Sequence, residues 1–212
     1  LVRQSVALAT TALLCASLAT AARAAYNARP PLAHTGGFDE KTCRECHFDG
    51  PTSSPGTVAL GGVPERYRRG AVYRLEVVIR DNSAQLGGFQ LAARVAAGPH
   101  AGTQAGMLCA MDTRVAVAAD STTGVQYASH AGAAPADSLR WQLEWRAPGE
   151  DVGSVIFHVA ANSANDDGSQ LGDVILLASR ETRPIETGVR SQESGIRGCQ
   201  AAGAGGTARA QP

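Results

Sequence analysis

The pattern Cys43-x-x-Cys46-His47 is the one place in the sequence where residue type and spacing together specify a chemistry. Two thiols separated by two residues can form thioethers with the two vinyl groups on one edge of a porphyrin. The histidine that follows then lies under the ring, where its imidazole can ligate iron. In a chain of this composition, chance gives about 0.003 such patterns. The motif therefore predicts one covalent haem c, with Cys43 and Cys46 as tethers and His47 as proximal ligand.

Two other chemistries use a Cys-x-x-Cys pair. A redox disulfide needs a thioredoxin-like βαβ context, and no such pattern surrounds Cys43 and Cys46. A zinc site usually needs a second Cys/His pair, which the chain lacks at ordinary spacing. Haem is the leading prediction, with a disulfide and zinc as the alternatives.

A haem iron that transfers electrons usually takes a second axial ligand, whereas an open site suits gas or peroxide chemistry. We expect His130 in that role, because it ends a strand-like run that a Gly- and Pro-containing stretch then breaks. His158 lies within a predicted strand, and we interpret Met107 and Met111 as core-filling residues. The candidates considered are His34, His100, Met107, Met111, His130 and His158.

An uncharged apolar run extends from Val6 to Thr20, with Arg3 before it and Ala22-Arg23-Ala24 after it. A basic flank, a short apolar core and a small-x-small exit are the three parts of a secretory signal peptide. Spanning a bilayer takes about 20 apolar residues, so we interpret residues 1–24 as a cleaved leader and expect no stable membrane insertion afterwards. The sequence thus predicts a periplasmic or secreted protein, which agrees with thioether attachment outside the cytoplasm.

Charge and composition narrow the function classes. The chain has 19 basic and 19 acidic residues, and loss of Arg3 and Arg23 with the leader leaves 17 against 19. Without a basic patch we expect no nucleic acid partner. No Gly-x-Ser-x-Gly elbow occurs, so hydrolase chemistry has no support and we predict that the protein is not an enzyme.

Alternation of apolar and polar residues dominates the middle of the chain. The segments 73–80 and 139–146 alternate with period two, which is typical of strands with one buried face, and Trp141 and Trp145 share that face. Weaker strand signals cover residues 56–60, 88–96, 113–118, 124–130, 152–160 and 173–179. Many short strands without an amphipathic helix predict an all-β fold, an Ig-like antiparallel β-sandwich.

The remaining segments have distinct compositions. Residues 25–55 form an irregular haem-attachment segment with a helical turn near Glu40–Glu45, residues 56–182 form the sandwich, and residues 183–212 are predicted to be disordered. Cys109 and Cys199 could form a disulfide, or Cys199 could stay unpaired in the tail. The polar segment from Asn162 to Asp173 lacks the calcium-loop spacing, so we interpret it as a structural loop.

A set of ordered sequence blocks resembles the bacterial Reelin-domain-like (Reeler, or choice-of-anchor V) proteins over about Tyr26 to Ser179. The blocks are Thr35-Gly36-Gly37-Phe38, Thr42-Cys43-x-x-Cys46-His47-Phe48-Asp49, Gly88-Phe89-Gln90-Leu91, Gly124-Val125-Gln126-Tyr127-x-x-His130, Trp141-x-x-x-Trp145-x-Ala147-Pro148, Phe157-His158-Val159-Ala160-Ala161-Asn162-x-Ala164-Asn165 and Gly172-Asp173. The resemblance implies an extracellular Ig-like β-sandwich with the Cys-x-x-Cys-His segment before it. It implies no particular reaction.

These observations together predict an exported monohaem c-type cytochrome that passes single electrons to a redox partner protein. One alternative is an extracellular interaction module in which the motif is structural. The other is a haem-based gas sensor or peroxidase with an open distal site.

Overall fold

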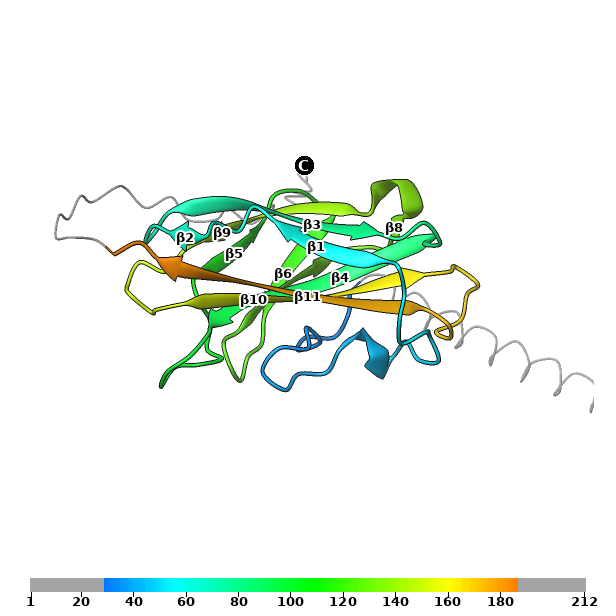
Figure 1. Cartoon of the computed structure of the whole chain (residues 1–212), viewed down its shortest axis with the longest axis horizontal. Coiled ribbons are helices and arrows are strands. Elements are labelled where there is room, and N and C mark those ends of the chain that lie inside the picture. The colour runs from blue at the N-terminus through cyan, green and yellow to red at the C-terminus, as the bar shows by residue number, and fades with distance from the viewer. Residues whose placement is uncertain (1–28, 187–212) are drawn as a thin grey trace, which may run out of the picture.

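Strands with alternating apolar and polar residues build two sheets that pack face to face, as the computed structural model of the chain shows (Figure 1). The structure describes residues 29–186. The first sheet has the order β1-β3-β9-β5, with β1 Thr57–Gly61, β3 Val72–Arg80, β9 Arg140–Arg146 and β5 Met107–Ala110.

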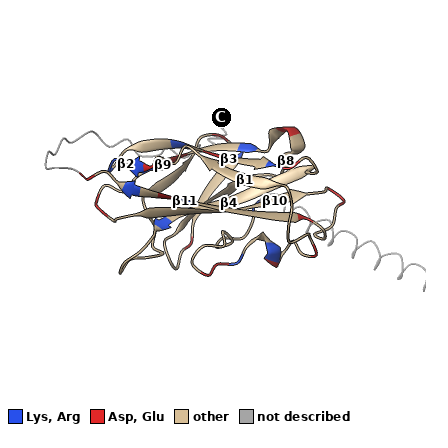
Figure 2. Ribbon diagram, viewed as in Figure 1, with Lys and Arg blue, Asp and Glu red and all other residues tan. Residues whose placement is uncertain are grey.

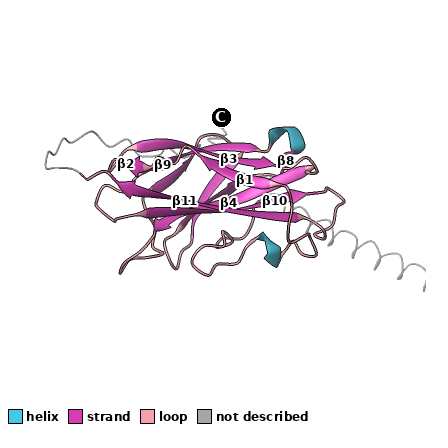
Figure 3. Ribbon diagram, viewed as in Figure 1, coloured by secondary structure: helices cyan, strands magenta, loops and turns pink. Residues whose placement is uncertain are grey.

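The second sheet has the order β2-β11-β10-β4-β7-β6, and β8 also pairs with β4. Its strands are β2 Arg66–Tyr67, β4 Leu86–Val95, β6 Val115–Ala119, β7 Gln126–His130, β8 Ala134–Pro135, β10 Val155–Ala164 and β11 Val174–Pro184. Among the described strands only β2 and β11 pair in parallel. Two short 3-10 helices, Cys43–Glu45 and Ala136–Ser138, complete the elements (Figure 3). The predicted antiparallel β-sandwich is confirmed.

The core lies between the two sheets and is rich in large side chains. Trp141 and Trp145 are fully buried on the inner face of β9, as the alternation predicted. Trp145 packs edge-on against Phe157 of β10 with ring centroids 4.9 Å apart, and its indole N–H donates to the carbonyl of Ala105 at 2.9 Å. The aromatic pair thus joins the two sheets, and the indole hydrogen bond ties β9 to the connection between β4 and β5.

One prediction about the fold is wrong. Met107 and Met111 are 41% and 37% exposed rather than core-filling, because β5 is an edge strand and Met111 lies just beyond its end. β11 extends to Pro184, two residues past the boundary expected after residue 182, and its last residues pair with β2. Period two fails there because Ser179–Glu181 are all exposed. The predicted leader, residues 1–24, and most of the predicted tail lie outside the described residues.

The irregular segment before β1 covers the outer face of the second sheet (Figure 1). On β4, Phe89, Leu91 and Ala93 belong to the core, so the residues between them face outward. Two of these outward residues, Gln90 and Arg94, are nevertheless buried. The segment, residues 29–56, is therefore a packed part of the fold.

Buried polar contacts fasten this segment to the sheet. Arg94 forms an ion pair with Glu40 of the segment, and the hydroxyl of Tyr127 also hydrogen-bonds to the Glu40 carboxylate. The other Glu40 oxygen accepts from the Thr35 hydroxyl at 2.5 Å. Charged side chains outside this contact lie mostly at strand ends and loops (Figure 2).

We expect Arg94→Met to lower the free energy of unfolding by about 3–5 kcal/mol, because it leaves the Glu40 carboxylate buried without its partner. The matched control is Arg74→Met, since the Arg74 side chain is 79% exposed and pairs with Glu144 at 3.9 Å. That variant should lose less than about 1 kcal/mol. Urea unfolding measures both, and equal losses would show that the Glu40–Arg94 contact is not a buried anchor.

Candidate functional site

The Cys-x-x-Cys-His motif is folded into one tight turn. Thr42 caps the 3-10 helix Cys43–Glu45, its hydroxyl accepting from the backbone N–H of Arg44 at 3.2 Å. The carbonyl of Cys43 accepts from the N–H groups of both Cys46 and His47, at 3.2 and 2.9 Å. This turn holds both thiols and the imidazole close together. It lies within the region where the sequence predicted a helical turn.

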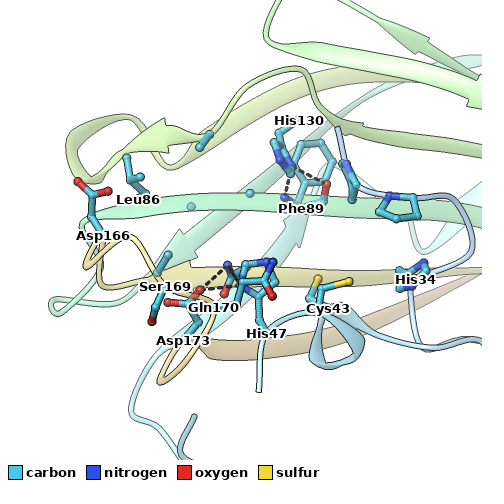
Figure 4. A pocket seen from close by; sticks show the side chains of 18 of the residues that line it. His34, Cys43, His47, Leu86, Phe89, His130, Asp166, Ser169, Gln170 and Asp173 are labelled. Carbon is cyan, nitrogen blue, oxygen red and sulfur yellow. Dashed lines mark hydrogen bonds and ion pairs between the residues drawn. The ribbon is translucent and has the colours of Figure 1, made fainter. Parts of the chain in front are cut away.

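This turn forms one wall of a cavity of about 490 Å³ between the N-terminal segment and the outer face of the second sheet. The opposite wall comes from the ends of β4, β7 and β10. Figure 4 shows the imidazoles of His47 and His130 and the sulfur of Cys43 around it. The lining includes Pro30, Pro31, His34, Cys43, Cys46, His47, Gly88, Phe89, His130, Asn162, Asp166 and Asp173. All four predicted site residues, Cys43, Cys46, His47 and His130, therefore lie on one cavity.

His47 is fixed by the loop between β10 and β11. Its Nδ1 atom lies 2.6 Å from a carboxylate oxygen of Asp173, which is buried. Backbone hydrogen bonds join Phe48 to the same loop, from Phe48 to the Gln170 carbonyl and from Gly172 to the Phe48 carbonyl, both at 3.1 Å. Within residues 29–186 the Nε2 atom of His47 makes no hydrogen bond.

His130 enters from the last position of β7, the strand end where it was predicted. Its Nδ1 atom lies 3.0 Å from the N–H of Phe89 and 3.2 Å from the Phe89 carbonyl. The Phe89 N–H donates to Nδ1 in the shorter contact. In the other tautomer Nδ1–H donates to the Phe89 carbonyl, and only that tautomer leaves the Nε2 lone pair for a ligand. The ring lies directly on the backbone of Gly88, where a Cβ atom would be 2.5 Å from Cε1 of His130. A glycine is therefore required at residue 88 for His130 to occupy this place.

The other candidates for the second axial ligand differ in their position relative to the cavity. His34 also lines the cavity, but in the view of Figure 4 Cys43 lies between it and His47. His158 packs its ring edge-on against Phe38, with centroids 5.6 Å apart, and does not line the cavity. His100, Met107 and Met111 are exposed and lie outside the lining.

The thiols of the motif are free. Cys43 and Cys46 form no disulfide, whereas Cys109 is disulfide-bonded. The predicted partner of Cys109, Cys199, lies outside the described residues. Burial raises the pKa of the Cys43 thiol to about 12, and the neighbouring Cys46 adds to the effect. Redox Cys-x-x-Cys motifs depend on a lowered thiol pKa, so this environment favours a protonated thiol over disulfide exchange.

The residues around the cavity include the kinds of group that hold a haem c. Among residues 29–186 no group of three or more His, Cys, Asp or Glu side chains could hold a metal ion. A haem iron needs only axial ligands from the protein, since the porphyrin supplies the other four. Two imidazoles whose Nε2 atoms make no hydrogen bond to the described residues, two free thiols and a cavity within the roughly 300–1,000 Å³ typical of ligand sites fit that requirement.

Sequence reasoning missed Asp173 and Asn162 as site residues. Asp173 was placed at the start of a strand, and the loop before it was interpreted as structural. The amide of Asn162 donates to Asp173 at 3.1 Å, and Gly50 packs so closely that a Cβ atom there would lie 1.8 Å from the Asp173 carbonyl oxygen. Two signals were available: the run of polar residues after β10, and the presence of Asn162 and Gly172-Asp173 among the sequence blocks that carry the family resemblance.

The buried histidines make stability depend on pH. Burial lowers the pKa of His130 below 6.5; the contact with the Phe89 backbone opposes this shift, and the nearby His47 adds to it. Burial also lowers the pKa of His158. Below pH 6.5 the unfolded chain binds more protons than the folded one, so the free energy of unfolding falls as the pH falls. We expect this in urea unfolding of the haem-free protein.

His130→Gln should flatten this pH dependence, whereas His100→Gln, at an exposed position, should leave it as in the wild type. An unchanged slope in His130→Gln would mean that His130 is not buried against Phe89 and Gly88.

No family model and no curated protein matches the chain. Among solved structures, the Reelin-N domain of F-spondin is similar with a TM-score of 0.47 and 17% identity, over 68% of this chain and 96% of that one. The human F-spondin reeler domain gives 0.46 and 17%, over 65% and 92%. A cohesin module of a Clostridium perfringens family 33 glycoside hydrolase gives 0.43 and 11%, over 62% and 98%. Within residues 29–186 no helix is long and apolar enough to cross a membrane.

Proposed function

We propose that the protein is an exported monohaem c-type cytochrome that carries single electrons. Cys43 and Cys46 tether the haem through thioethers, His47 is the proximal ligand and His130 is the second axial ligand. The haem, when bound, supplies a one-electron couple. The protein supplies the attachment, the axial nitrogens and a cavity that limits access of water.

One observation carries this proposal: two histidines that are far apart in the sequence face one cavity, each engaged through Nδ1 and each without a hydrogen bond from Nε2 to a described residue. Metal-ligating histidines characteristically use one ring nitrogen for the metal and the other for a carboxylate or carbonyl partner. His47 has the Asp173 carboxylate in that role, and His130 in its Nδ1–H tautomer has the Phe89 carbonyl. A disulfide or a purely structural turn would not need either imidazole there.

The environment of the site favours a carrier over an enzyme. Ligation by both His47 and His130 fills the axial positions, so no position remains for oxygen or peroxide. An open cavity edge is sufficient for electron transfer to a redox partner protein. The export of the chain rests on the leader pattern in residues 1–24, and the proposed location is the periplasm or the extracellular space.

Covalent attachment provides the first test. Protein made in a periplasm that contains haem-ligation machinery should begin at Ala25 and carry one haem that survives a denaturing gel, because thioethers do not dissociate. The double variant Cys43→Ala/Cys46→Ala should lose all haem staining. Arg44→Ala, which changes an exposed residue between the two cysteines, should keep it. Staining that persists in the double variant would refute the attachment.

The second axial ligand provides the next test. Wild-type protein should give a low-spin, six-coordinate spectrum in both redox states. His130→Ala should convert the iron to high spin and allow it to bind carbon monoxide, because Nε2 of His130 is removed. His158→Ala is the matched control and should keep the wild-type spectrum.

The same spectra separate the alternatives. If His130→Ala keeps the low-spin spectrum and His34→Ala loses it, then His34 is the ligand and the assignment of His130 is wrong. High-spin iron that binds carbon monoxide in the wild type would instead indicate a gas sensor or peroxidase. Absence of haem under competent ligation would leave an interaction module.

A further inference from the structure

We propose that Asp173 is a positioning residue that sets both the tautomer of His47 and the reduction potential of the haem. The inference rests on the proposed function, because it concerns the proximal ligand of that haem. Asp173 does not contact the iron in this proposal; it acts through the imidazole of His47.

Asp173 is held in place from several sides. It is 2% exposed and follows Gly172, at the point where the β10–β11 loop enters β11. One carboxylate oxygen accepts from the backbone N–H of Asn165 at 3.2 Å. The other lies 3.1 Å from the amide nitrogen of Asn162 and 2.6 Å from Nδ1 of His47. The carboxylate is thus preorganised before His47 docks against it.

The short contact selects one tautomer of His47. Two lone pairs cannot approach to 2.6 Å without repulsion, and a carboxylate oxygen has no proton to donate. The proton must therefore lie on Nδ1 of His47, which donates to Asp173. The Asn162 amide nitrogen is 3.1 Å from both the His47 Nδ1 atom and Asp173, and it donates to the carboxylate. Nε2 is then the nitrogen whose lone pair is available for iron.

Backbone contacts also hold the Cys-x-x-Cys-His turn against the loop that carries Asp173. Phe48, the residue after His47, forms an isolated parallel bridge with Leu171, two residues before Asp173. Gly50, two residues after Phe48, lies against the backbone carbonyl of Asp173. The backbone next to His47 is therefore held against the backbone next to Asp173. The imidazole and the carboxylate are therefore positioned by backbone contacts and do not depend on the haem to bring them together.

A carboxylate that accepts a hydrogen bond from the non-ligating ring nitrogen of a histidine makes that histidine a stronger electron-pair donor to the metal. A stronger donor favours ferric over ferrous iron, because the ferric state has the larger positive charge. Asp173 should therefore lower the reduction potential relative to a neutral partner at the same place. A residue with a merely structural role would not change the reduction potential in this way.

The first experiment is made on the haem-free full chain. Nitrogen-15 spectra of the imidazoles should show His47 protonated at Nδ1 in the wild type. Asp173→Asn should shift His47 away from that tautomer, because the new amide can donate to Nδ1. The wild-type measurement needs no variant, so it decides the tautomer even if Asp173→Asn does not fold. A wild-type His47 protonated at Nε2 would overturn the proposal.

The second experiment is a redox titration of the holoprotein. Asp173→Asn should raise the reduction potential by the equivalent of at least a tenfold change in the reduction equilibrium, which is about 59 mV for one electron. The matched control is Asp49→Asn, which removes a charge at an exposed residue near His47 whose φ of 60° asparagine also adopts. A low-spin spectrum in both variants shows that ligation is intact.

The outcomes are distinguishable. Equal shifts in Asp173→Asn and Asp49→Asn would mean that only general charge matters, and the positioning role would be refuted. If no haem attaches to the wild type, the proposed function fails, but the nitrogen-15 spectra still decide whether Asp173 selects the tautomer of His47.

Discussion

The buried ion pair between Glu40 and Arg94 is the contact on which the site depends. Without it, the segment that carries the Cys-x-x-Cys-His motif would have few apolar side chains with which to hold the sheet. A buried pair contributes little net stability compared with an apolar substitute, but losing one partner is expensive. The pair therefore acts as a specificity device: it makes one docked position of the segment far better than any displaced one. The Tyr127 hydroxyl donates to the same Glu40 oxygen that pairs with Arg94, and the Thr35 hydroxyl donates to the other oxygen.

The backbone of the docked N-terminal segment, residues 29–56, adopts several energetically unfavourable conformations. Ala33, Phe38, Asp39 and Asp49 all have positive φ, and only one further non-glycine residue in the described range, Asp166, does. Such conformations cost about 1–3 kcal/mol each, so a segment that contains four of them needs strong anchoring elsewhere. Asp166 lines the same cavity. The unusual backbone is thus concentrated around the site, which is where such strain is found when function requires a particular placement of side chains.

The sequence predicted the parts of this arrangement that are local. The motif is a five-residue pattern, and the sandwich follows from period-two alternation, so both could be found without any knowledge of contacts. His130 could be proposed because a strand end lets a side chain leave the sheet. Asp173 could not, because its contact with His47 spans 126 residues and depends on how the β10–β11 loop meets the segment.

Arg94 shows the same limit from another direction. Alternation with Phe89, Leu91 and Ala93 puts it on the outer face of β4, where an arginine is normally solvated. Nothing nearby in the sequence indicates that the N-terminal segment covers it. The methionines were misinterpreted for a related reason: the sequence does not reveal that β5 is an edge strand. Local patterns predict which face a residue is on, but only the assembled sheets decide whether that face is buried.

The position of the cavity follows from how the sandwich is packed. Trp141, Trp145 and Phe157 fill the space between the sheets, so a planar cofactor could enter the core only by displacing the contacts that join them. The outer face of the second sheet has no such constraint. At the start of β4, Gly88 leaves that face open enough for the ring of His130 to lie on the backbone. Adding a segment in front of the first strand then creates a second wall without altering the core. The scaffold can therefore keep its stability while the site is built from strand ends, one loop and the segment, which is the general way in which a function is added to an existing fold.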